Sequence, residues 1–278
     1  MSQPPLEHAR IQTNGIMLHT VQAGPVDGPV VILLHGFPEF WYCWHHQIPA
    51  LASAGFRVIA PDMRGYHLSE KPRSLAAYSL NELAADVIGL IDALGRDQVY
   101  LVGHDWGGVV AWWTARNYPE RIAKLAILNA PHTSVFGKFL RTHPTQMLRS
   151  WYMGFFQLPL LPELLCSLLW IRPPTPGFSP ADLAEYRKAI RQPRALTCMI
   201  NYYRAGVRIR GRPRTASRRI TMPTLILWGK HDLYLDARLA ALSADLCDHV
   251  TVEMLDTSHW IQHDAPEIIS ARLIEFFS

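Results

Sequence analysis

The sequence predicts an α/β fold, in which a mostly parallel sheet is covered by helices on both faces and carries a helical insertion. Two observations lead to this prediction. In the first half of the chain, short apolar runs of strand length alternate with longer segments of helical period, as in parallel sheets. From residue 132 to residue 215 the alternation stops, and a proline-rich, aromatic segment of helical pattern replaces it.

The expected elements can be followed along the chain. A hairpin over residues 11–22 turns at Asn14-Gly15, which is a strong turn signal. Further strands are expected at residues 30–34, 57–60, 99–102, 125–128, 224–228 and 250–255. Helices are expected near residues 44–52, 80–94, 109–118 and 266–277.

This order of elements suggests two domains. We expect a core formed by residues 1–131 and 216–278, and a helical cap, or lid, formed by residues 132–215 after the sixth strand. Residues 151–171 are mostly apolar and long enough to span a bilayer. Gln157, Pro159, Pro162 and Glu163 interrupt this stretch, so we assign it to the cap and expect no membrane contact.

Composition indicates a soluble enzyme. The net charge of +4 is mild, and the seven arginines from Arg204 to Arg219 show no interleaved aromatic residues. We therefore expect a solvated surface there and no nucleic-acid partner. The N-terminus lacks a charged-then-apolar signal, and the four cysteines form no C-x-x-C pair or metal-ligand spacing. These features favour a cytoplasmic protein without disulfides, and they leave a homo-oligomer open.

A carboxylate stands where many enzymes of this pattern have a serine. The apolar run 99–102 is followed by Gly103-His104-Asp105-Trp106-Gly107-Gly108 and then a helical stretch, so Asp105 occupies the nucleophile position of a strand–turn–helix motif. When a carboxylate displaces a leaving group from a saturated carbon, the product is an ester that the enzyme can hydrolyse, whereas a serine would give a stable ether. Asp105 therefore indicates epoxide opening or carbon–halogen hydrolysis.

Two further residues follow in the order that such a nucleophile requires. Asp232 comes after the predicted strand 224–228, and His259 lies in the loop after strand 250–255. We expect Asp232 to orient His259 and to stabilise the imidazolium that forms. With an ordinary pKa near ~6.5, His259 can be neutral at pH 7 and so can deprotonate water.

Water attack on the ester requires donors for the developing oxyanion. The residue after the nucleophile, Trp106, is expected to supply one backbone N–H. The loop after strand 30–34 is expected to supply the second from Phe37, because the following Pro38 has no N–H.

Several segments resemble the α/β-hydrolase-fold epoxide hydrolases over nearly the whole chain. They are His35-Gly36-Phe37-Pro38-Glu39-Phe40-Trp41-Tyr42 with Trp44 and Gln47, Pro61-Asp62 with Arg64-Gly65-Tyr66, the Asp105 motif, and Asn129-Ala130-Pro131-His132. The resemblance implies the α/β-hydrolase fold with a cap whose two tyrosines hold the epoxide oxygen and protonate it. Matching segments imply Tyr152 and Tyr203 for these roles, with Tyr202 as the alternative to Tyr203. The chain departs from the family at His67, where glycine is usual, and at Ala205, where asparagine often occurs.

The function implied is hydrolysis of an apolar epoxide to a vicinal diol through a covalent ester on Asp105, with no cofactor and no metal. A haloalkane or haloacid dehalogenase using the same aspartate is the first alternative. Phe37 and Trp106 stand where dehalogenases often have a halide-binding or carboxylate-binding side chain, which disfavours that reading. A non-catalytic ligand receptor is the second alternative, and the complete set of catalytic residues disfavours it. The sequence does not specify which epoxide is the substrate.

Overall fold

The structure is a computed structural model that describes residues 4–169, 177–209 and 211–278. Ile171 in the apolar stretch and Arg210 in the arginine-rich segment therefore lie outside the described residues. The centre of the fold is an eight-stranded sheet of order β1-β2-β4-β3-β5-β6-β7-β8. Its strands are β1 Glu7–Thr13, β2 Ile16–Ala23, β3 Val30–Leu34, β4 Arg57–Pro61, β5 Val99–His104, β6 Ile122–Leu128, β7 Thr224–Gly229 and β8 Val250–Leu255.

The strand pairing confirms a mostly parallel sheet. Strands β1 and β2 form an antiparallel hairpin, and both of its turn residues, Asn14 and Gly15, have positive φ, as a tight hairpin turn requires. Strand β2 also pairs antiparallel with β4, while β4, β3, β5, β6, β7 and β8 are mutually parallel. Leu34, Gly103 and His104, Leu128 and Gly229 consequently end their strands along one edge of the sheet.

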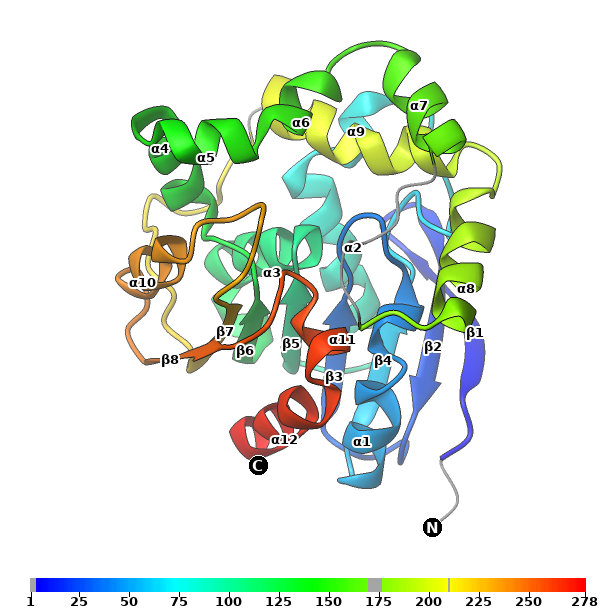
Figure 1. Ribbon diagram of the computed structural model, residues 1–278. Coiled ribbons are helices and arrows are strands. Elements are labelled where there is room, and N and C mark those ends of the chain that lie inside the picture. The colour runs from blue at the N-terminus through cyan, green and yellow to red at the C-terminus, as the bar shows by residue number, and fades with distance from the viewer. Residues whose placement is uncertain (1–3, 170–176, 210) are drawn as a thin grey trace.

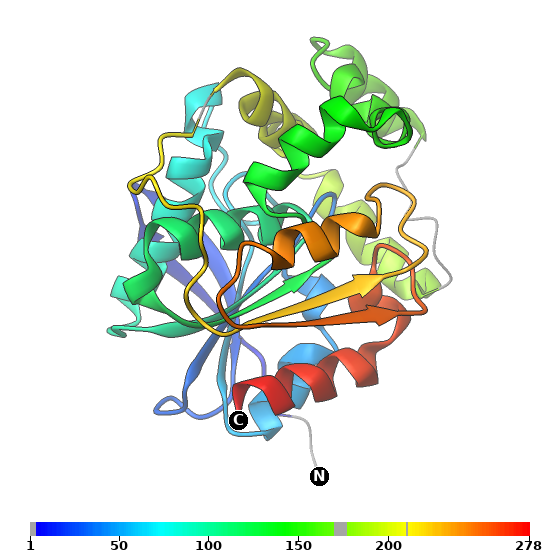
Figure 2. The ribbon, with the colours of Figure 1, turned by 90° about the vertical axis from the view of Figure 1, so that its left-hand side faces the viewer.

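Helices cover both faces of the sheet, as predicted (Figures 1 and 2). Helices α2 (Leu80–Ala93), α3 (Trp106–Asn117) and α10 (Arg238–Ala244) lie on one face. Helices α1 (Gln47–Ser53), α11 (Ile261–Asp264) and α12 (Pro266–Phe277) lie on the other.

Two predicted helix boundaries were wrong. Helix α3 begins at Trp106 and not at residue 109, because the chain reverses at Asp105 and glycine is tolerated in the first turn. The expected helix 44–52 begins later, as helix α1 at Gln47, and a 3-10 helix, η1, precedes it at Trp41–Trp44. Pro49 lacks an N–H and fits only the first turn of a helix, so α1 cannot extend far before it.

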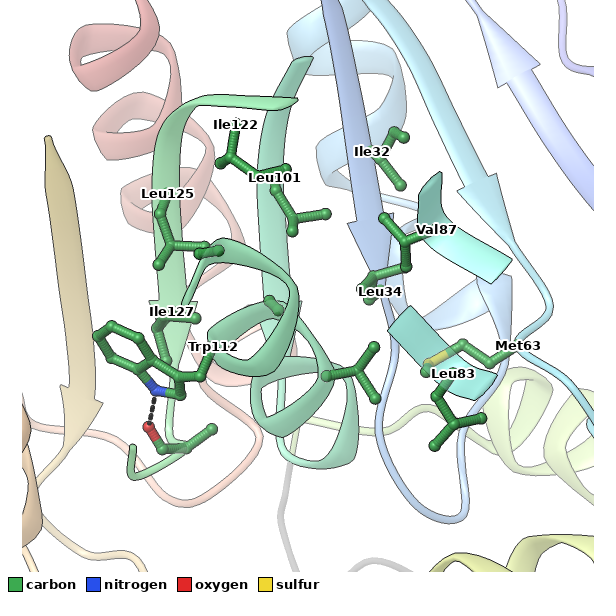
Figure 3. Close-up of a cluster of buried hydrophobic side chains, with 14 of the residues drawn as sticks. Ile32, Leu34, Met63, Leu83, Val87, Leu101, Trp112, Ile122, Leu125 and Ile127 are labelled. Atoms are coloured by element: carbon green, nitrogen blue, oxygen red, sulfur yellow. Dashed lines mark hydrogen bonds between the residues drawn. The ribbon is translucent and has the colours of Figure 1, made fainter. Parts of the chain in front are cut away.

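The core between the sheet and helices α2 and α3 supports the turn after β6. Figure 3 shows Ile32, Leu101 and Leu125 from the strands facing this helical layer. Trp112 of α3 is fully buried, and its indole Nε1–H donates to Ala130 O at 2.9 Å (Figure 3). The residue before Ala130, Asn129, is thereby held at the end of β6.

The chain between β6 and β7 contains helices that lie across the carboxyl ends of the strands (Figure 1). The apolar stretch 151–171 is not one helix. Helix α6 ends at Phe155, Pro159 lies in the connection, and Pro162 lies in the first turn of α7, where a proline is tolerated. No helix in the described ranges is long and apolar enough to cross a membrane. The helices are α4 Thr133–Thr142, α5 Pro144–Arg149, α6 Trp151–Phe155, α7 Leu161–Leu169, α8 Pro180–Ile190 and α9 Ala195–Arg208.

One arginine differs from the predicted solvated surface. Arg204 is buried, and its guanidinium pairs with Glu163 at 2.7 Å and donates to the carbonyl oxygens of Phe156 and Leu158. Because Arg204 belongs to α9 and Glu163 to α7, this pair holds the two helices together. The sequence showed only a run of arginines and could not reveal that the first of them faces inward.

Candidate functional site

Asp105 lies on a sharp, strained turn between β5 and α3. Its φ of 49° and ψ of −119° are unusual for any residue other than glycine. Close packing around the turn requires small neighbours. A Cβ added at Gly107 would lie 2.2 Å from Leu34 O, and one at Gly36 would lie 2.5 Å from Asp105 Cβ. The turn therefore presents the carboxylate at the carboxyl edge of the sheet, as its position in the motif predicts.

One of the two predicted oxyanion donors contacts the carboxylate directly. The Phe37 N–H donates to Asp105 Oδ1 at 2.8 Å. The Trp106 N–H lies in the first turn of α3, and within the described chain it makes no hydrogen bond to the Asp105 carboxylate. Both Phe37 and Trp106 therefore lie next to the nucleophile. Within the described residues, only the Phe37 N–H donates a hydrogen bond to the Asp105 carboxylate.

The structure brings Asp232 and His259 together beside Asp105. His259 Nδ1 is 2.7 Å from Asp232 Oδ2, and His259 Nε2 is 3.6 Å from Asp105 Oδ2. Asp232 Oδ1 accepts the backbone N–H groups of Tyr234 and Leu235. These contacts fix the carboxylate that orients the imidazole.

Asn129 is a member of this group that the sequence reasoning left without a role. Its Nδ2 donates to Asp232 Oδ2 at 2.7 Å, and its Oδ1 accepts the Gly229 N–H at 3.0 Å. Asn129 also has a positive φ of 43°, a conformation that asparagine tolerates better than most residues. The motif Asn129-Ala130-Pro131-His132 at a strand end was the available signal.

The surroundings of His259 raise its pKa above the ordinary value while Asp105 is free. Burial alone would lower the pKa of His259, but the carboxylates of Asp232 and Asp105 raise it to about 10. Burial would raise the pKa of Asp232, and the His259 charge and donated hydrogen bonds hold it below its usual range. At pH 7 the group is therefore an imidazolium between two carboxylates.

A cavity opens in front of Asp105. Its volume is about 580 Å³, and its walls are mostly apolar, with Trp151, Phe155, Phe156 and Leu165 among them. A second space of about 250 Å³ lies beside α3 and α4. Asp105, Tyr152 and Tyr203 line both spaces.

The two predicted tyrosines meet at this place. Tyr152 comes from α6 and Tyr203 from α9, and their ring centroids are 5.7 Å apart. Burial, followed by the charge of Asp105, raises the pKa of both phenols above the usual value. Both are therefore protonated at neutral pH and able to donate a hydrogen bond into the cavity.

Tyr202, the alternative to Tyr203, points elsewhere. Its side chain is fully buried, and its hydroxyl donates to Arg64 O at 2.8 Å. Tyr202 lines neither space beside Asp105. Adjacent residues on a helix point about 100° apart, so only the docking of α9 determines which one faces the cavity.

A second cluster of buried polar residues, centred on Glu39, lies next to the site. The sequence reasoning also missed it. Glu39 is fully buried and accepts from His104, His263 and Tyr186. Burial would raise the pKa of Glu39, but the hydrogen bonds from His104 and His263 hold it well below its usual range. His104 Nε2 lies 2.9 Å from the backbone oxygen of His259, which links this group to the site.

Comparison with known proteins agrees with the geometry. Residues 29–266 match the alpha/beta hydrolase fold family. The AB hydrolase superfamily protein YfhM of Bacillus subtilis is 40% identical over 276 residues, with 96% of each chain covered. Epoxide hydrolase 4 of Mus musculus is 37% identical over 286 residues, which cover 97% of this chain and 78% of the mouse protein.

A solved structure of an epoxide hydrolase is also similar to this chain. It is described as a novel epoxide hydrolase of the alpha/beta hydrolases superfamily from metagenomes of hot environments. It superposes with a TM-score of 0.88 at 34% identity and covers 99% of both chains.

The chain belongs to the epoxide hydrolases of the α/β-hydrolase fold.

This confirms the predicted fold class and family, and with them a hydrolase. In this epoxide-hydrolase family member, the larger cavity is lined by Asp105, His259, Tyr152, Tyr203 and Phe37. Trp106 lines the second space, and Asp232 contacts His259 from outside both spaces. The phenyl side chain of Phe37 has no N–H or O–H group to donate to a halide. This continues to argue against a dehalogenase.

Proposed function

We propose that this protein hydrolyses an apolar epoxide to a vicinal diol through a covalent ester on Asp105. The observation that supports this most strongly is the position of the Asp105 carboxylate, which lines the same apolar space as two protonated phenols. An alkoxide that remains tethered to the substrate needs a proton donor, and a phenol with a raised pKa stays protonated to supply one.

In the first step, an Asp105 carboxylate oxygen attacks one epoxide carbon. The carbon–oxygen bond of the ring breaks, and a phenol of Tyr152 or Tyr203 donates a proton to the departing oxygen. The product is a hydroxyalkyl ester. Phe37 N–H, at 2.8 Å from Oδ1, positions the carboxylate for this attack.

Formation of the ester changes the state of His259. The Asp105 carboxylate is then neutral, so one of the two charges that raise the pKa of His259 is removed. The lowered pKa allows His259 to release a proton, which restores the phenol that was deprotonated in the first step. The neutral His259 then accepts a proton from water, while Asp232 stabilises the imidazolium.

In the second step, the activated water attacks the carboxyl carbon of the ester. The backbone N–H groups of Phe37 and Trp106 are the proposed donors to the oxyanion. The acyl carbon–oxygen bond breaks, and the departing oxygen takes the second proton of the attacking water. The diol leaves with the original Asp105 oxygen, and the water oxygen stays on the regenerated Asp105 carboxylate.

The helical segment between β6 and β7 supplies the two tyrosines in this proposal. We assign residues 132–215 as the cap and residues 1–131 and 216–278 as the core. Two facts support this division: α6 carries Tyr152 and α9 carries Tyr203, and both helices lie across the strand ends (Figure 1). We further propose a cytoplasmic location, supported by the four free, buried cysteines, which need no oxidising compartment.

A single turnover in heavy-oxygen water tests the covalent route. Excess enzyme is mixed with a styrene-type epoxide, and the diol and an Asp105 peptide are weighed by mass spectrometry. The proposal requires the label in Asp105 and unlabelled oxygen in the first diol formed. Label in the diol alone would show direct attack by water, and wild-type diol formation by Asp105→Ala would exclude Asp105 as the nucleophile.

A further inference from the structure

A cluster of histidines around one buried carboxylate lies outside the proposed catalytic group. His19 is on β2, Asp62 follows β4, and His67 is in the loop after it. His19 Nδ1 and His67 Nδ1 lie 2.7 Å and 2.9 Å from the same oxygen, Asp62 Oδ2. The three ligand-type atoms lie within 4.8 Å of one another.

The backbone at His67 has an unusual conformation, which its contacts hold in place. His67 has a φ of 36°, in the left-handed region that favours glycine. A strained residue other than glycine persists only where the surroundings hold it. The His67 ring is held by Asp62 and by Phe40, whose ring centroid is 4.6 Å away.

We propose that His19, Asp62 and His67 bind one divalent transition-metal ion, with Zn²⁺ as the best match. Two imidazoles and one carboxylate form a donor set typical of zinc, and water would complete the coordination. The site is independent of the epoxide reaction, which needs no metal in the proposed mechanism.

Metal binding requires the three ligand atoms to change their spacing. Ligand atoms of a tetrahedral zinc ion, each ~2.0–2.1 Å from the metal, lie about 3.3 Å apart. The two contacts to Asp62 must therefore widen by about half an ångström. The two imidazole nitrogens, which lie within 4.8 Å of each other, must come to the same spacing. The carboxylate itself is fixed, because the Trp41 N–H donates to Oδ1 at 3.1 Å and the Leu68 N–H approaches Oδ2 at 3.3 Å.

A third histidine, His8, supports the protonation state that a metal needs. To bind through Nδ1, a neutral histidine must carry its proton on Nε2. His19 Nε2 lies 3.0 Å from His8 Nδ1, so this proton can be donated to His8. Such a partner for the second ring nitrogen fixes the tautomer and orientation of a metal-binding histidine.

Metal binding to the full chain can be measured without reference to activity. The metal-free protein is titrated with Co²⁺, whose visible absorption reports histidine and carboxylate coordination, and its melting temperature is measured with and without Zn²⁺. We expect one equivalent to bind. Zn²⁺ at one hundred times its Kd should shift the folding equilibrium about 100-fold toward the native state and raise the melting temperature by several degrees.

Two variants make the test specific. His67→Asn keeps a residue that tolerates positive φ and can donate to Asp62, but it removes the imidazole, so the Co²⁺ band and the Zn²⁺ shift should be lost. His231→Gln removes the exposed histidine paired with Asp256 and should leave both signals unchanged. Absence of a Co²⁺ band in the wild type, or equal binding by His67→Asn, would overturn the proposal.

Discussion

The imidazole of His259 and the carboxylate of Asp105 form an ion pair, with Nε2 3.6 Å from Oδ2. This pair has opposite consequences in the two proposed steps. While Asp105 is free, its charge helps to raise the pKa of His259 to about 10 and keeps the imidazole protonated. Once Asp105 is esterified, that contribution disappears, so the nucleophile itself switches the histidine from an acid to a base.

The raised pKa of His259 predicts how stability depends on pH. The folded-state pKa lies above the unfolded value of about 6.5, so this contribution to stability is fully present below pH 6.5. It is lost as the pH rises through about 10. Denaturant unfolding should therefore show a loss of stability between these pH values in the wild type.

The His259→Gln variant is the control for that measurement. It should show a flatter pH dependence over the same window, because glutamine does not titrate. Parallel pH profiles for the wild type and His259→Gln would contradict the ion pair as the cause.

The two cavity tyrosines should act on ring opening. We expect Tyr152→Phe and Tyr203→Phe each to slow formation of the ester by roughly 100-fold, the lower end of the usual effect of general acid catalysis. The rate is measured by stopped-flow tryptophan fluorescence with excess enzyme, since Trp106 and Trp151 lie at the cavity.

Tyr202→Phe is the matched control for these variants, because the residue is adjacent to Tyr203 on the same helix. It loses the hydrogen bond to Arg64 O, so we expect a loss of about 1–3 kcal/mol in the free energy of unfolding. The ester should form at close to the wild-type rate. A larger effect on that rate from Tyr202→Phe than from Tyr203→Phe would reverse the assignment.

Asn129 should influence the second step through Asp232. Asn129→Gly suits the positive φ at this position and removes the donor to Asp232 Oδ2. A hydrogen bond to a charged group contributes about 1.5–3 kcal/mol, so hydrolysis of the ester should slow by roughly 10-fold to 100-fold. Rapid-quench kinetics separates the steps, and an equal slowing of ester formation would argue against a role confined to Asp232.

The sequence predicted the parts of the molecule that depend on local pattern. The strands at residues 30–34 and 250–255 and the helix at residues 266–277 have the bounds that were expected. The Asp105 turn was predictable because its glycines, strand and helix adjoin in sequence. Asp232 and His259 were predictable because the fold places functional residues after particular strands.

Properties that depend on contacts between residues far apart in the sequence could not be predicted from local pattern. Glu39 meets His104 and His263 across 65 and 224 residues, and no local pattern pairs them. The raised pKa of His259 could not be predicted from the sequence, because it depends on two carboxylates that converge on the imidazole only in the fold. The division of residues 132–215 from the core and the proposed residue roles remain predictions.

The most direct test of the proposed chemistry is the intact mass of the His259→Gln variant after exposure to a mixture of epoxides and haloalkanes. This variant should form the ester but hydrolyse it slowly, because it lacks the base for the second step. The mechanism predicts an adduct equal to one whole epoxide, located on Asp105 by peptide mapping and absent from the double variant with Asp105→Ala. An adduct equal to a haloalkane without its halide would contradict the proposed function and identify a dehalogenase, and an epoxide adduct on any other residue would contradict Asp105 as the nucleophile.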